Sequence, residues 1–355
     1  MSELKIQRVT QSRRPPSFEQ LGFGEQFTDH MFLMDYDEEG GWSRPRIVPY
    51  GPLKLEPAAA VLHYAQAVFD GLKAFRGTDG SIRLFRPVDH ADRLNRSCDR
   101  LCIPRIDPEL LVWSFRQLLR VDASWVPEGI GRSLYLRPAI IATEPFLGVR
   151  PAKKYTYFLI LSPVGSYYSG GRKPLRIFAT DKYVRAVEGG IGSAKTAGNY
   201  AASLFAATEA HRLGYSQVLW LDGVHRKYID EVGTMNIMVR LENEVVTPPL
   251  SDSILPGITR DSALALLRSW SVNVSERPLA ITELFDAVRA GNLREIWGTG
   301  TAAVVSPIGE IAYRNRQLIV PQIDHDSLSE KLYEALTGIQ YGITADAFRW
   351  TEIVD

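Results

Sequence analysis

The 355-residue chain contains little cysteine and has no excess charge of either sign. Its two cysteines, Cys98 and Cys102, stand four residues apart, and neither a second pair nor a nearby histidine completes a metal-binding set. We therefore expect reduced thiols and no bound metal. Lys and Arg together number 41, as do Asp and Glu, so no net field would attract nucleic acid or an anionic membrane. The expected partners are small molecules or a second subunit.

Long apolar runs are also missing. No stretch approaches the roughly 18 apolar residues that a membrane-spanning helix needs. The N-terminal segment holds the pair Arg13-Arg14 without an apolar stretch behind it, so it lacks the anatomy of an export signal. The sequence therefore predicts a soluble cytoplasmic protein.

The length of the chain allows two domains, and the order of strand-like and helix-like segments places their boundary near residue 170. Residues 166–174, SYYSGGRKP, cluster Ser, Gly and Pro between two strand-like runs, which is typical of a linker. We predict an α/β protein with a small α+β domain over residues 1–165, this linker, and a larger α/β domain over residues 175–355. Helical patterns are expected over residues 86–101, 108–119, 199–213, 259–270, 282–290 and 327–337.

Lys195 stands out because its neighbours in GGIGSAKTAGNY, residues 189–200, have almost no bulk. A surface lysine usually lies among polar residues, so this pattern indicates that a large group approaches the amine closely. The segment is one residue away from a phosphate-binding loop, but Ala194 stands where that loop requires its second glycine. This departure disfavours a nucleotide triphosphatase. Lys195 is expected on the loop just before a helix.

Two other short motifs carry weaker signals. GTGTAA, residues 298–303, is similar to a dinucleotide-binding fingerprint, but the residues after it read as β and turn instead of helix. We interpret it as a glycine-rich turn whose amides and threonine hydroxyls face a small anion. Glu231, in DEVGTMNIMV, comes just before a strand, where an isolated glutamate is more often a solvated charge.

Several segments, in this order along nearly the whole chain, carry a family resemblance: FGEQFTDHM, FDGLKAFR, HADRLNRS, SLYLRP, SAKTAGNYAAS, QVLWLDG, DEVGTMN, VTPPLSDSILPGITR and GTGTAAVVSPIG. Together they resemble the branched-chain amino-acid aminotransferases, pyridoxal-phosphate enzymes of fold type IV. Two departures exist. Asp70 stands where the family usually has glutamate, and Ala303 and Ser306 replace a cysteine pair of some animal members, which argues against redox regulation of that kind.

The resemblance implies a pyridoxal 5′-phosphate cofactor linked to Lys195 as an imine, with the lysine acting as both tether and base. Glu231 would keep the pyridine nitrogen protonated, and Tyr200 would donate a hydrogen bond to the phenolic oxygen. The phosphate would be bound by a further set of residues at the start of a helix and in the GTGTA turn. That set is Arg93, Ile258, Thr259 and Thr301.

For the substrates, the resemblance implies transfer of the amino group of leucine, isoleucine or valine to 2-oxoglutarate, which gives glutamate. Thr301 and Ala302 would bind the α-carboxylate, and Arg137 the distal carboxylate of glutamate. Tyr135 and Arg137 are two apart on a predicted strand and therefore face the same side. Further pocket walls would be Tyr64, Phe69 and Tyr167, the last on the linker. The family forms its active sites across a subunit interface, which implies a homodimer.

Three alternatives remain open at this point. Two lie within the fold group, a D-amino-acid aminotransferase and an aminodeoxychorismate lyase, although these relatives are typically shorter and lack the FTDHM and VTPPL segments. The third is a protein that only carries or senses the cofactor. Retention of Lys195, Glu231 and Tyr200 together argues against that reading.

Overall fold

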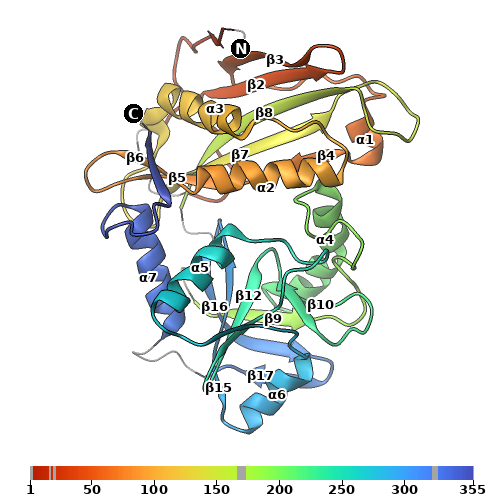
Figure 1. The fold of residues 1–355 in the computed structure, drawn as a ribbon, viewed down its shortest axis with the longest axis vertical. Helices are drawn as coiled ribbons and strands as arrows, with labels where there is room; N and C mark the ends of the chain where they lie inside the picture. The colour runs from red at the N-terminus through yellow and green to blue at the C-terminus, as the bar shows by residue number, and fades with distance from the viewer. Residues whose placement is uncertain (1–2, 16, 19–20, 166–172, 322–326, 355) are drawn as a thin grey trace. The chain divides into compact units, whose positions relative to one another are not determined.

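The computed structural model describes residues 3–15, 17–18, 21–165, 173–321 and 327–354. The chain forms two compact units (Figure 1). The first comprises residues 1–169, 194–197 and 337–355, and the second comprises residues 170–193 and 198–336. The predicted domains differ from these units in two places, because residues 337–355 and the lysine segment 194–197 both belong to the first unit. The linker, 166–174, lies outside the described residues except for its last two positions.

The first unit is built on a largely antiparallel sheet. Its strands follow the order β1-β3-β2-β8-β7-β5-β6-β18, and β4 also pairs with β7. Two long central strands, β7 and β8, pair over ten residues, from Ser133↔Val164 to Ala142↔Tyr155. The bounds are β1 Lys5–Ile6, β2 His30–Asp37, β3 Gly41–Pro49, β4 Ala67–Phe69, β5 Leu72–Arg76, β6 Ile82–Phe85, β7 Ser133–Ala142, β8 Lys154–Val164 and β18 Thr351–Val354.

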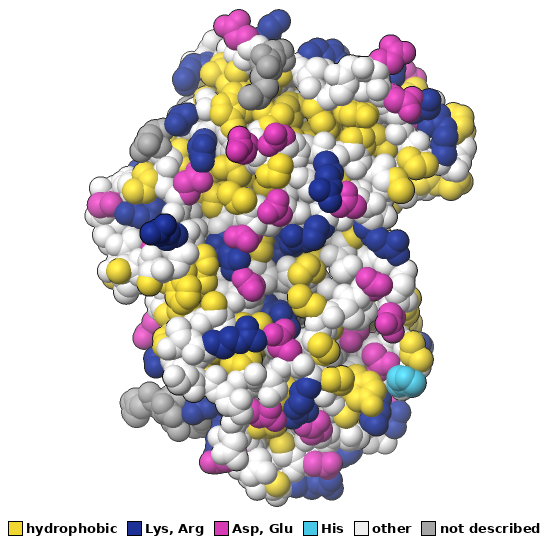
Figure 2. All heavy atoms as spheres, in the orientation of Figure 1, with side chains coloured by type: hydrophobic (Ala, Val, Ile, Leu, Met, Phe, Trp, Pro, Cys, Tyr) yellow, Lys and Arg dark blue, Asp and Glu magenta, His cyan; other side chains and the backbone are white. Residues whose placement is uncertain are grey.

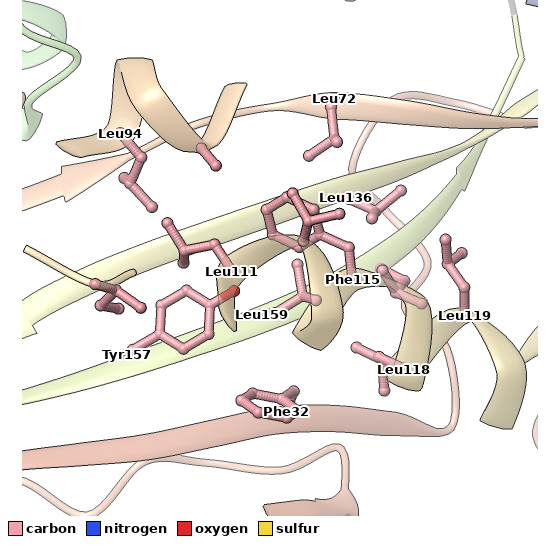
Figure 3. Close-up of a cluster of buried hydrophobic side chains, with 14 of the residues drawn as sticks. Phe32, Leu72, Leu94, Leu111, Phe115, Leu118, Leu119, Leu136, Tyr157 and Leu159 are labelled. Atoms are coloured by element: carbon pink, nitrogen blue, oxygen red, sulfur yellow. The ribbon is translucent and has the colours of Figure 1, made fainter. Parts of the chain in front are cut away.

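The two faces of this sheet differ in chemistry. One face is covered by the helices α2 (Pro87–Arg100) and α3 (Pro108–Val121) and holds the apolar core (Figure 1). Figure 3 shows Leu72, Leu136 and Leu159 of the strands facing Leu111, Phe115 and Leu118 of α3. Because side chains alternate along a strand, the residues between these point to the opposite face. That opposite face carries Phe69, Lys73, Tyr135 and Arg137.

The second unit contains a mixed sheet with the strand order β11-β10-β9-β16-β15-β12-β13-β14, in which β17 also pairs with β16. The pairs β9–β10 and β9–β16 are parallel, whereas β15 pairs antiparallel with both β12 and β16. The bounds are β9 Leu175–Ala179, β10 Gln217–Leu221, β11 Ile229–Val232, β12 Asn236–Leu241, β13 Val245–Thr247, β14 Val274–Glu276, β15 Leu293–Gly300, β16 Val304–Tyr313 and β17 Arg316–Ile319.

The predicted helices are present, with ends that differ by a few residues. Besides α2 and α3 they are α4 (Ala197–Arg212), α5 (Ile258–Ser269), α6 (Ile281–Arg289) and α7 (Leu328–Gln340), and the short α1 spans Ala60–Tyr64. Ser327 Oγ accepts a hydrogen bond from the Glu330 amide at 3.1 Å and so caps α7. Within the described residues, no helix is long and apolar enough to cross a membrane.

Candidate active site

The backbone around Lys195 is anchored to β4 and α2 of the first unit. Its amide donates to Ser97 Oγ at 2.9 Å, and its carbonyl accepts from the Phe69 amide at 3.0 Å. Next to it, Thr196 Oγ1 donates to the Ala67 carbonyl at 2.7 Å. Ala194, which precedes the lysine, is buried. The lysine therefore stands on a loop that hydrogen bonds hold on both sides of it.

The sheet face opposite the core brings the amine of Lys195 close to a second cation. Lys195 Nζ lies 4.9 Å from the centroid of the Phe69 ring, and the Arg137 guanidinium carbon lies 4.6 Å from the same centroid. Arg137 also donates to the Tyr135 hydroxyl at 3.0 Å. That hydroxyl lies against Gly71, where any Cβ would overlap it. The structure therefore brings together Lys195, Phe69, Tyr135 and Arg137, which are four of the residues expected at the site.

Arg93 lies on α2 in a buried charge cluster. Its Nε and Nη2 atoms donate to the two carboxylate oxygens of Asp70 at 2.8 and 2.7 Å, and His90 Nδ1 lies 2.7 Å from Asp70 Oδ1. Burial opposes ionisation of Asp70, but the Arg93 charge and the hydrogen bonds from Arg93 and His90 outweigh it and hold the pKa of Asp70 well below its usual range. Burial lowers the pKa of His90. Arg93 is thus a fixed cation with an ionised carboxylate behind it.

Glu231 lies on β11 of the second unit and is almost fully buried. Its Oε1 atom accepts from Asn236 Nδ2 and from the Leu255 amide, both at 3.1 Å, and its Oε2 atom lies 2.9 Å from Arg185 Nε. Asn236 also donates to the Leu255 carbonyl at 2.9 Å. A carboxylate in such a frame is held in one orientation.

Two backbone features of the second unit suit an anion. Helix α5 begins after Gly257, and no side chain caps that end, so the amides of Ile258 and Thr259 lie where a helix binds anions. The turn between β15 and β16 contains Thr301 and Ala302, and the next residue but one, Val304, has φ of 59°. A β-branched residue in that region is strained, and strain of this kind is typical of backbone at functional sites.

Three tyrosines predicted for the site have different positions. Tyr200 lies in the first turn of α4 in the second unit. Tyr64, at the end of α1, is 41% exposed and donates to the Leu147 carbonyl, so it does not join Phe69 and Tyr135 on the sheet face. Tyr167 lies outside the described residues.

Sequence reasoning missed the residues that hold the charged groups in place, namely Asp70, His90, Ser97, Arg185 and Asn236. One signal was available, because His90, Arg93 and Ser97 follow each other at helical spacing in HADRLNRS. The partners Asp70 and Arg185 come from distant segments and left no local signal. Within the described ranges, no group of three or more His, Cys, Asp or Glu side chains could hold a metal ion.

Known proteins share this fold and sequence. The fold is that of the fold-type IV aminotransferases. The structure of the branched-chain amino acid aminotransferase of Escherichia coli aligns over 92% of this chain and 99% of the Escherichia coli chain, with a TM-score of 0.76 and 25% sequence identity. A family model described as amino-transferase class IV matches residues 67–311. Branched-chain-amino-acid aminotransferase 2 of Bacillus subtilis is 53% identical over 97% of the chain and 95% of its own length. Branched-chain-amino-acid transaminase 1 of the same organism is 51% identical over 98% of each. The chain belongs to the class IV aminotransferases.

The residues present fit the pyridoxal 5′-phosphate that this family uses. A lysine among small residues suits a covalently held aldehyde, and Arg93 and the uncapped start of α5 suit a phosphate. Glu231 offers a carboxylate oriented by two hydrogen-bond donors and by an ion pair with Arg185. In addition, the Thr299 hydroxyl on β15 is buried with no partner among the described residues.

Proposed function

We propose that this chain is a branched-chain amino-acid aminotransferase that moves the amino group of leucine, isoleucine or valine to 2-oxoglutarate. The single observation that carries the proposal is the placement of Lys195 Nζ and the Arg137 guanidinium near the same Phe69 ring. A reactive amine and a cation that can bind a carboxylate thus lie near the same aromatic ring. Relatives with 53% and 51% identity over almost the full chain support the substrate class.

Pyridoxal 5′-phosphate, when bound, supplies an electron sink that makes the substrate Cα proton removable. Lys195 would hold the cofactor covalently, and its amine, once released, would serve as the base for the substrate Cα proton. Glu231 would accept a hydrogen bond from the pyridine nitrogen and so favour its protonated form, and Tyr200 would donate one to the phenolic oxygen. Arg93, Ile258, Thr259 and Thr301 would bind the phosphate, while Ala302 and Thr301 would donate to the substrate α-carboxylate.

Arg137 and Phe69 let one pocket serve two unlike side chains. An apolar side chain packs on the aromatic rings of Phe69 and Tyr135, while the guanidinium keeps its contacts with the Tyr135 hydroxyl at 3.0 Å and with the Phe69 ring. Arg137 has no carboxylate within ion-pair distance among the residues that the structure describes. Its charge is therefore available to the distal carboxylate of glutamate or 2-oxoglutarate.

An exposed apolar patch supports the proposal of a homodimer. Leu62 and Tyr64 of α1 lie beside the loop of residues 143–150, because the Ala60 amide donates to the Glu144 carbonyl and Tyr64 to that of Leu147. In the same loop Val149 is 86% exposed. Patches of this kind mark interaction surfaces. A second subunit that covers this patch would bring Tyr64 close to the partner's substrate.

Surface charge is consistent with small-molecule substrates in a cytoplasmic enzyme that binds neither nucleic acid nor membranes. The net charge is zero, and Lys and Arg side chains are interspersed with Asp and Glu on the face in Figure 2. A mixed surface of this kind exerts little long-range attraction on a polyanion.

Reduction of the holoenzyme with borohydride followed by peptide mass spectrometry tests the tether. The cofactor adduct should fall on Lys195, and Lys195→Ala should abolish both the adduct and transamination while Lys182→Ala, at an exposed lysine, keeps both. The absorbance of the lysine-bound cofactor should disappear with L-leucine and return with 2-oxoglutarate. A response to D-amino acids in place of L-leucine, or an adduct on another lysine, would contradict the proposal.

A further inference from the structure

The side chain of Asn236 joins two parts of the second unit that the proposed function uses separately. Asn236 begins β12 and is 5% exposed. Glu231 lies five residues earlier on β11, and the two strands are connected by a tight turn in which Val232 and Met235 exchange both backbone hydrogen bonds, at 3.0 and 2.9 Å. This turn brings the side-chain amide of Asn236 next to the Glu231 carboxylate.

The orientation of the Asn236 amide follows from its two acceptors. Nδ2 donates to Glu231 Oε1 at 3.1 Å and to the Leu255 carbonyl at 2.9 Å. Because both partners only accept, the nitrogen must be on that side. The Leu255 amide then donates to the same Glu231 oxygen at 3.1 Å. Two donors therefore fix one carboxylate oxygen within a closed ring of three hydrogen bonds.

The other end of the same amide faces the start of α5. Asn236 Oδ1 lies against Gly257, the residue before the helix, so closely that any Cβ there would overlap it. Gly257 has φ of −72° and ψ of 129°, which any residue can adopt. Glycine is therefore needed at this position for space and not for backbone conformation.

We infer that Asn236 is a positioning residue that sets the Glu231 carboxylate and the α5 N-terminus relative to each other. The inference rests on the proposed function, in which Glu231 meets the pyridine nitrogen and α5 the phosphate of one rigid cofactor. Loss of the Nδ2 donor raises the proton affinity of Glu231 and turns its carboxylate, so the ring nitrogen is less often protonated. A change at Gly257 reaches Glu231 through the same amide.

The test compares Asn236→Leu, which removes both hydrogen bonds, and Asn236→Asp, which keeps the shape but replaces the donor with an acceptor. Asn273→Leu is the control, because this amide also donates to a backbone carbonyl, at 3.1 Å, but is exposed. The readout is the NMR signal of pyridoxal 5′-phosphate labelled with ¹⁵N in the ring, recorded on the holoenzymes between pH 6 and 9. Both Asn236 variants should lose ring-nitrogen protonation within that range, whereas the wild type and Asn273→Leu keep it.

A second pair of variants tests the steric link. Gly257→Ala should weaken binding of pyridoxal 5′-phosphate about tenfold, which corresponds to about 1.4 kcal/mol. Combining it with Asn236→Ala should restore most of that affinity, because the shorter side chain makes room for the Cβ, while ring protonation stays impaired. Equal protonation in all variants, or effects of the two substitutions that simply add, would overturn the inference. If the wild type carries no cofactor on Lys195, the proposed function itself fails.

Discussion

Asp70 in the first unit and Glu231 in the second are both buried carboxylates next to an arginine and a hydrogen-bond donor. The proposed function gives them different roles. Asp70 accepts hydrogen bonds from the Gly71 amide, from His90 and twice from Arg93. Glu231 accepts two hydrogen bonds at Oε1, and its Oε2 atom forms an ion pair with Arg185. In the proposed function, the Asp70 carboxylate supports an arginine that would bind the cofactor phosphate. Arg185 and the Asn236 amide support a carboxylate that would bind the pyridine nitrogen.

The comparison predicts the largest loss of stability for Asp70→Asn. This change leaves the buried Arg93 cation without its fixed counter-charge, which should lower the free energy of unfolding of the apoenzyme by about 3 kcal/mol. In the proposed function, pyridoxal 5′-phosphate would bring a replacement anion to Arg93. Thermal unfolding of the apo and holo forms should therefore show a larger stabilisation by the cofactor in the variant than in the wild type.

Asp89→Asn is the matched control for that experiment. Asp89 pairs with Arg86 at 2.8 Å on the same helix, but it is 47% exposed, so its loss should cost less than about 1 kcal/mol. If both variants lose the same amount, Asp70 does not support Arg93 in the way the comparison requires.

Glu231→Gln should produce the next largest effect, on rate instead of stability. A neutral amide can keep the two hydrogen bonds that Oε1 accepts, but it loses the ion pair with Arg185 and cannot hold the pyridine nitrogen protonated. Both half-reactions should therefore slow by about 10²- to 10³-fold. Single-turnover absorbance with L-leucine and with L-glutamate measures this loss. Near-normal rates would assign the carboxylate a structural role like that of Asp70.

The two clusters also differ in how well the local sequence predicts their members. Lys195, Arg93 and Glu231 belong to short motifs whose order along the chain resembles one family, so they could be predicted. Their supports could not, because Asp70 reaches Arg93 only after β4 and α2 pack, and Arg185 reaches Glu231 across 46 positions of chain. The strands β2 and β3 also leave a weak local signal. Their pattern alternates weakly, and β3 contains Pro45 and Pro49, which offer no amide donor to a sheet.

The lack of a local sequence signal also explains why the two units differ from the domains expected from the sequence. Residues 351–354 form β18 and pair with β6, from Thr351↔Phe85 to Val354↔Ile82. Segments more than 260 residues apart in sequence thus share one sheet, and no composition change marks the return. Lys195 is similar, since its contacts with Ser97 and Phe69 place its segment with the first unit.

Asp230, the neighbour of Glu231 on β11, provides a buried carboxyl without a close ion pair. Burial raises the pKa of Asp230 to about 6, although a hydrogen bond with Ser253 and the charge of Arg185 oppose the rise. Its contribution to stability is complete below pH 3.8 and is lost as the pH rises through about 6. Asp230→Asn cannot ionise, so it should be more stable than the wild type above pH 6, by up to about 3 kcal/mol. Near pH 4 the two should be equal.

Urea unfolding of both proteins at several pH values between 4 and 8 measures this difference. Asp286→Asn, at an exposed carboxylate in α6, is the control and should follow the wild type throughout. A stability difference between Asp230→Asn and the wild type that does not change with pH would show that Asp230 acts through its hydrogen bond and not through its charge.

Arg137 sharpens the contrast with Arg93 and gives the smallest expected effect. Arg93 is compensated by Asp70, whereas Arg137 rests on the Phe69 ring and donates to the Tyr135 hydroxyl at 3.0 Å. A charge-assisted hydrogen bond to a distal carboxylate contributes about 1.5 to 3 kcal/mol, so Arg137→Ala should lower kcat/KM for glutamate and 2-oxoglutarate by roughly one to two orders of magnitude. Leucine has no such carboxylate and should lose much less. Stopped-flow absorbance with each amino acid separately measures the two losses.

Arg137→Lys keeps the charge without the planar guanidinium fork, so its kcat/KM for glutamate should lie between those of Arg137→Ala and the wild type. An equal deficit for leucine and glutamate would mean that the guanidinium supports the packing of Phe69 and Tyr135 and does not select the second substrate.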